Sequence, residues 1–150
     1  MKKTIIFLMF LAIAHFTNAQ IRNPVAWSFT AKKVGSKVFE VHLTAAIEKG
    51  WHLYSQTTPD GGPVPTTITF TKNPLLTLNG IVKEVGKLEQ HHEKLFGVDV
   101  KQFSNKVDFV QVIQVKSNVK TLVNGTINFM VCNDHECLPP SEQKFSIELK

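Results

Sequence analysis

Two cysteines near the end of this 150-residue sequence offer its clearest chemistry. They lie in residues 132–140 (Cys-Asn-Asp-His-Glu-Cys-Leu-Pro-Pro), with four residues between them. A two-residue turn at Asp134-His135 would make Cys132 and Cys137 direct neighbours on antiparallel strands, where opposed Cα atoms lie about 4.5–5.5 Å apart. Because a disulfide accepts that separation, the spacing permits a local bridge across a hairpin.

A bridge of this kind closes a very short loop, so it constrains the unfolded chain less than a bridge between distant strands would. Ile127, Phe129 and Val131 alternate on one face of a predicted strand, which places Cys132 on the opposite face, beside polar residues. We expect another molecule to reach a cysteine in that position. This favours thiol–disulfide exchange, in which a thiolate attacks a disulfide sulfur and needs access to it.

Two other roles for the pair stay open at this point. The bridge can be a purely structural clip in a domain that binds a partner without catalysis. Alternatively, Cys132, His135 and Cys137 can bind a soft metal together with His91 or His92, although four residues between cysteines is not a usual zinc spacing. Two cysteines in all exclude a multi-disulfide scaffold and a four-thiolate zinc site.

The first nineteen residues have the three parts of a secretory signal peptide. Basic residues open the chain (Met1-Lys2-Lys3), an apolar run covers Ile5 to Ala14, and small or polar residues precede Gln20. The apolar run is too short to span a membrane, which takes about 20 residues. We therefore expect cleavage near Ala19 and a periplasmic or secreted domain over residues 20–150, in a compartment where disulfides form.

Composition and pattern predict one all-β domain. Hydrophobic residues make up 43% of the chain, enough for a core, and the net charge of +5 with a single arginine gives no basic cluster for nucleic acid. No segment has helical periodicity over three turns. Apolar and polar residues alternate instead in short strand-like segments: 26–31, 37–44, 66–71, 107–116, 126–132 and 145–149.

Turn and breaker residues separate these predicted strands. Residues 55–65 contain three prolines and two glycines, so they form neither a helix nor a central strand. Asn124-Gly125 is a strong tight-turn signal. Short strands at regular spacing in a chain of this length predict an antiparallel β-sandwich.

The sequence resembles the N-terminal periplasmic domain of the thiol:disulfide interchange protein DsbD, also called the disulfide bond corrector domain. The resemblance covers most of residues 20–150, and its most specific element is the cysteine pair followed by Leu138 and two prolines. Residues 50–54 (Gly-Trp-His-Leu-Tyr) match a Gly-aromatic-x-Leu-Tyr segment of the family. Residues 93–97 (Glu-Lys-Leu-Phe-Gly) fall where the family has an acidic-aromatic-Gly segment.

The resemblance implies an immunoglobulin-like antiparallel β-sandwich with Cys132 and Cys137 as the redox pair. It also implies a capping segment over residues 93–97 that begins at Glu93 and has Leu95 or Phe96 at its tip. Tyr54 and His52 would lie beside the pair. No cofactor or metal is implied.

The implied partner is a thioredoxin-like protein or domain. Since the sequence ends at Lys150, we expect that partner, and a membrane electron donor, to be separate chains. The implied activity is that of a protein-disulfide reductase component, and Cys137, at the strand edge before the prolines, is the sulfur we expect to be attacked.

Overall fold

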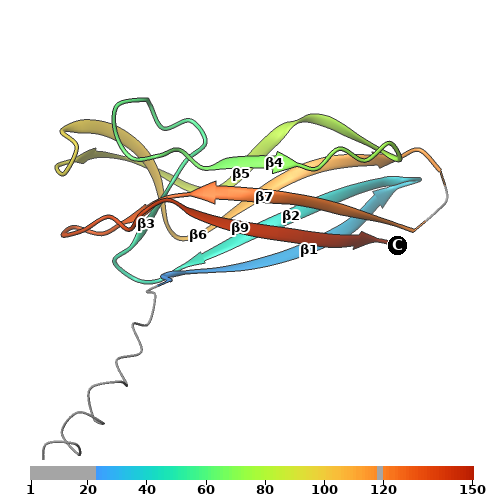
Figure 1. Ribbon diagram of the computed structural model, residues 1–150, viewed down its shortest axis with the longest axis horizontal. Coiled ribbons are helices and arrows are strands. Elements are labelled where there is room, and N and C mark those ends of the chain that lie inside the picture. The colour runs from blue at the N-terminus through green and yellow to red at the C-terminus, as the bar shows by residue number, and fades with distance from the viewer. Residues whose placement is uncertain (1–22, 118–119) are drawn as a thin grey trace, which may run out of the picture.

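Figure 1 shows the computed structural model, which describes residues 23–117 and 120–150. The predicted signal peptide lies outside the described residues. Within them, no helix is long and apolar enough to cross a membrane. The described chain forms these strands: β1 (Val25–Gly35), β2 (Val38–Ile47), β3 (His52–Tyr54), β4 (Thr67–Phe70), β5 (Leu76–Glu93), β6 (Val98–Val115), β7 (Thr121–Phe129), β8 (Val131–Cys132) and β9 (Ser141–Leu149).

The strands form two antiparallel sheets that face each other across one core (Figure 1). The first has the order β1-β2-β6-β3-β8, with β5 also paired to β6, and the second has the order β4-β7-β9. The long strand β6 joins the two ends of the first sheet. Its C-terminal half pairs with β2 inside the core, while residues 102–104 pair with β3 next to the cysteines.

The predicted core faces are confirmed. Phe39, Val41 and Leu43 on β2 are buried, as are three alternating residues on each of the segments 127–131 and 145–149. Residues 107–115 pair on both sides, with β2 and with β5, so the prediction of a central strand there is also confirmed. The segment 55–65 forms no strand, as its prolines predict.

Strand β5 was not predicted from the sequence, because it lies at the edge of its sheet and most of its side chains are exposed. An edge strand with both faces exposed to solvent shows no alternation between apolar and polar residues. The three-residue strand β3 is too short to give a pattern. Both elements matter, because β3 carries His52 and Tyr54 and β5 ends at Glu93.

The prediction of a tight turn at Asn124-Gly125 is wrong. Both residues lie inside β7, where Gly125 pairs with Phe70 on one side and Phe145 on the other. A Cβ at Gly125 would lie 2.4 Å from the Phe145 ring and 2.5 Å from the Thr69 carbonyl oxygen. The glycine is therefore needed for close packing, which a local dipeptide signal cannot distinguish from a turn.

A disulfide packed against a buried tyrosine

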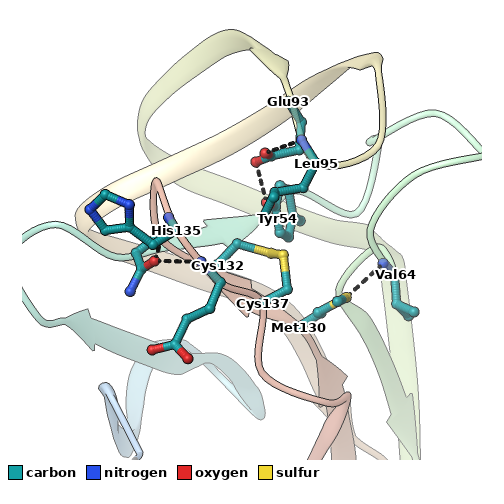
Figure 2. The surroundings of a disulfide bond; sticks show 10 residues. Tyr54, Val64, Glu93, Leu95, Met130, Cys132, His135 and Cys137 are labelled. Carbon is teal, nitrogen blue, oxygen red and sulfur yellow. Dashed lines mark hydrogen bonds between the residues drawn. A yellow bond between two sulfur atoms is a disulfide. The ribbon is translucent and has the colours of Figure 1, made fainter.

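Cys132 and Cys137 form a disulfide across a tight hairpin at the end of β8 (Figure 2). Asn133 N donates to Glu136 O over 2.9 Å, and Leu138 N donates to Val131 O over 3.0 Å. The cysteines thus form the pair between two hydrogen-bonded pairs, the position where opposed Cα atoms come closest, and here their Cα atoms are 4.0 Å apart. The predicted two-residue turn is confirmed.

The side chain of Asn133 stabilises this turn. Its Oδ1 accepts hydrogen bonds from the backbone N–H groups of His135 and Glu136, each over 2.8 Å. Asparagine often caps its own turn in this way. The loop that sets the geometry of the cysteines is therefore encoded in the residues between them.

The two sulfur-bearing residues differ in exposure. Cys132 does face away from the main core, as its alternation predicts, but it is 0% exposed, so the prediction that another molecule reaches it is wrong. A second, smaller cluster covers it, formed by Tyr54 and Val100 with Met130 and Cys137 packed against them. Cys137 is only partly buried and is the more accessible cysteine of the two.

Tyr54 connects this cluster to the β5–β6 hairpin. Its ring is fully buried, and its hydroxyl donates a 2.9 Å hydrogen bond to Oε2 of Glu93, which is itself only 6% exposed (Figure 2). Burial, then the hydrogen bond to Glu93 and its charge, raise the pKa of the Tyr54 phenol well above its usual range. The phenol therefore stays protonated and acts as a donor.

Glu93 also organises the hairpin tip, residues 94–97. Its carboxylate Oε1 accepts from Leu95 N over 3.3 Å, and its carbonyl accepts from Phe96 N and Gly97 N. Gly97 has a φ of 68°, in the left-handed region that suits glycine, and it closes the turn. The predicted capping residues Leu95 and Phe96 are 51% and 39% exposed at the tip. Figure 2 shows Leu95 on the far side of Tyr54 from the disulfide.

His52 lies directly opposite Cys132 in the pairing of β3 with β8. Its Nδ1 is 3.0 Å from Ser104 Oγ on β6, and Ser104 Oγ donates to Glu89 Oε2 on β5 over 2.8 Å. The fold thus brings the two cysteines together with Tyr54, Glu93 and His52 at one end of the first sheet. Ser104 and Glu89 were missed, because they lie on segments without a recognisable motif.

The proline-rich segment also borders the site. Val64 N lies 3.4 Å from Met130 Sδ (Figure 2), and the Thr66 hydroxyl donates to the carbonyl oxygen of Tyr54. Ser55 and Gln56 bind the carboxylate of Glu84 on β5. These bonds hold the backbone at Tyr54 and directly after it.

The alternative metal site is not formed. In residues 23–117 and 120–150, no three His, Cys, Asp or Glu side chains lie close enough to hold an ion together. His92 instead lies 2.8 Å from Asp99 on the exposed part of the β5–β6 hairpin.

Known proteins place this arrangement in a family. The crystal structure of the Neisseria meningitidis DsbD N-terminal domain in its reduced form has a TM-score of 0.55 and 15% identity, over 83% of this chain and 84% of that chain. The N-terminal periplasmic domain of ScsB from Proteus mirabilis has a TM-score of 0.57 and 15% identity, over 87% of this chain and 47% of that chain. These likenesses confirm the immunoglobulin-like antiparallel β-sandwich. No curated protein is significantly similar to this chain. The model of the family described as thiol:disulfide interchange protein DsbD, N-terminal, matches residues 18–149, and the chain therefore belongs to that family.

Proposed function

We propose that this domain carries out thiol–disulfide exchange through Cys132 and Cys137, relaying electrons to or from a thioredoxin-like partner. One observation carries the proposal most strongly. The disulfide joins a fully buried cysteine to a partly exposed one, and the buried cysteine packs with Tyr54, which hydrogen-bonds to Glu93 at the start of the hairpin tip. A partner can approach Cys137 from outside while the fold retains Cys132.

The exchange proceeds in two balanced steps. A partner thiolate attacks Cys137 Sγ, a mixed disulfide forms, and the Cys132–Cys137 bond breaks with its electron pair on Cys132 Sγ. A second partner thiol then attacks the partner's sulfur in the mixed disulfide and releases Cys137. Two electrons and two protons have then reached the pair, and the same steps run in reverse when the domain reduces an acceptor.

The tip at Leu95 and Phe96 acts in this proposal as a cap on the site, and Tyr54 and His52 line it. Family membership supports the exchange role, because the family is named for thiol:disulfide interchange. The partner is a thioredoxin-like protein or domain, with a membrane protein as the electron donor. The signal peptide over residues 1–19 would deliver residues 20–150 to the periplasm, the compartment named for the ScsB domain.

The second candidate is a non-catalytic immunoglobulin-like binding module in which the disulfide only clips a hairpin. The disulfide closes a loop of only six residues, and so short a loop restricts the unfolded chain little. This argues against a bridge whose purpose is to stabilise the fold. A clip would also work equally well with both cysteines buried. The difference in exposure between the two cysteines has a use in exchange and none in a clip.

Redox titration against glutathione separates the two candidates. An exchange pair is expected to have a midpoint in the range of thioredoxin-like proteins, about −270 to −120 mV, whereas a structural bridge has a midpoint below about −300 mV. Oxidised and reduced protein are quenched with a thiol-reactive maleimide and counted by mass. A midpoint below that limit would overturn the exchange role and leave the binding module.

A further inference from the structure

Hydrogen bonds link three polar side chains on three strands, and the last of them, His52, lies on the strand that pairs with the buried cysteine. Glu89 on β5 accepts from Ser104 on β6, and Ser104 lies 3.0 Å from His52 Nδ1 on β3. On the other side of β3, His52 faces Cys132 on β8. Directly opposed residues share one face of a sheet, with Cβ atoms about 4.5–5.5 Å apart. The side chains of His52 and Cys132 therefore lie on the same face of the sheet, as neighbours across the β3–β8 pair.

The hydrogen bonds determine which ring nitrogen of His52 is bonded to Ser104 and which is left free. The carboxylate of Glu89 can only accept, so the Ser104 hydroxyl donates its one hydrogen bond to Glu89. The Ser104 oxygen must then accept from His52, which places a proton on Nδ1. Nε2 has no hydrogen-bond partner among residues 23–117 and 120–150 and is free to take up or release a proton. A base oriented at one nitrogen and free at the other is the arrangement that acid–base chemistry needs.

Cys132 has a specific need for such a group. When the disulfide opens at Cys137, the electron pair goes to Cys132, which is 0% exposed and has no water to solvate a thiolate. A buried, unpaired charge is costly. Tyr54 packs in the same cluster, but its hydroxyl is already donated to Glu93. His52 is the opposed residue with a free nitrogen.

We propose that His52 protonates the Cys132 thiolate as it leaves, and that Ser104 and Glu89 position the imidazole for this step. This inference rests on the exchange function proposed above. In the step, the partner sulfur bonds to Cys137 Sγ, the Cys132–Cys137 bond breaks, and the proton on His52 Nε2 moves to Cys132 Sγ. The neutral imidazole then regains a proton from solvent. In the reverse direction, Nε2 removes the proton from Cys132 before it attacks Cys137.

The first test measures the rate at which dithiothreitol reduces the oxidised protein at pH 7. We expect His52→Gln to slow reduction about tenfold, less than the usual general-acid effect of about 10²–10⁴-fold, because a thiolate is a good leaving group. His92→Gln is the matched control, since His92 also hydrogen-bonds through Nδ1 but lies on the exposed hairpin, and it should leave the rate unchanged. The midpoint potential of both variants should equal that of the wild type, because a proton donor changes the rate and not the equilibrium.

Variants at Ser104 provide a second test of the same role if His52→Gln folds poorly. Ser104→Ala removes the group that orients Nδ1 and should also slow reduction, whereas Ser104→Thr retains the hydroxyl and should restore the rate. Equal rates for wild type, His52→Gln and Ser104→Ala would overturn the role of His52 while the wild type still exchanges thiols. A wild type that resists reduction altogether would instead contradict the exchange function itself.

Discussion

Removing the Tyr54 hydroxyl tests how strongly the disulfide cluster is tied to the hairpin tip. Tyr54→Phe keeps the buried ring and deletes only the donor to Glu93 Oε2. A hydrogen bond to a charged group contributes about 1.5–3 kcal/mol net, and a buried acceptor left unpaired costs at least as much as an average bond. Glu93 is 6% exposed and water reaches it poorly. We therefore expect the oxidised protein to lose about 2–3 kcal/mol of unfolding free energy.

Urea unfolding of the oxidised protein, followed by tryptophan fluorescence, gives this number without reducing the disulfide. Glu93→Gln and the double variant complete a double-mutant cycle, and the coupling energy between the two positions should be about 1 kcal/mol or more. A loss below about 0.5 kcal/mol in Tyr54→Phe, the level of an ordinary surface substitution, would refute the reasoning. It would mean that the bond is not a structural tie between cluster and tip.

Three further predictions follow from the same contacts. The chain has a single tyrosine, so absorbance at 295 nm reports Tyr54 alone and should show no tyrosinate in the folded protein at pH 11; a signal there would mean that the ring is accessible. The pKa of the unfolded phenol is the ordinary 10.0, while the folded phenol keeps its proton above that pH. The folded state then binds more protons, so stability above pH 10 should fall by up to about 1.4 kcal/mol per pH unit, and Tyr54→Phe should lack this component. Gly125→Ala should destabilise the fold by about 3 kcal/mol or prevent folding, because its Cβ would collide with the Phe145 ring and a backbone oxygen, and wild-type stability in urea would contradict that packing. Leu95→Ser should change stability by less than about 0.5 kcal/mol, since Leu95 is half exposed, yet it should raise the rate of reduction by dithiothreitol; an unchanged rate would argue against a capping role.

The sequence predicts the parts of this protein that depend on local order. Alternation identified the buried faces around Leu43, Ile127 and Ile147, because each strand there has one face on the core. The spacing of the cysteines predicted their turn, and Asn133, one of the residues between them, makes the bonds that close it. These are short-range properties, and a single segment of sequence contains the information for each.

The remaining features depend on contacts between distant segments. Gly125 looks like a turn residue until Phe145 and Thr69 are placed against it. Cys132 looks accessible by alternation, but Tyr54 and Val100 cover that face as well. Glu89 and Ser104 are fifteen residues apart and meet only because β5 and β6 pair. No periodicity in one strand can show what a neighbouring strand covers.

The most direct test of the central claim is a mixed disulfide trapped with a thioredoxin-like domain that lacks its resolving cysteine. Cys132→Ala leaves the partly exposed Cys137, and Cys137→Ala leaves the fully buried Cys132. If the pair exchanges thiols through Cys137, Cys132→Ala will form the mixed disulfide rapidly and Cys137→Ala will form it far more slowly. If neither variant forms a mixed disulfide, the pair is a structural clip and the proposed exchange function is wrong.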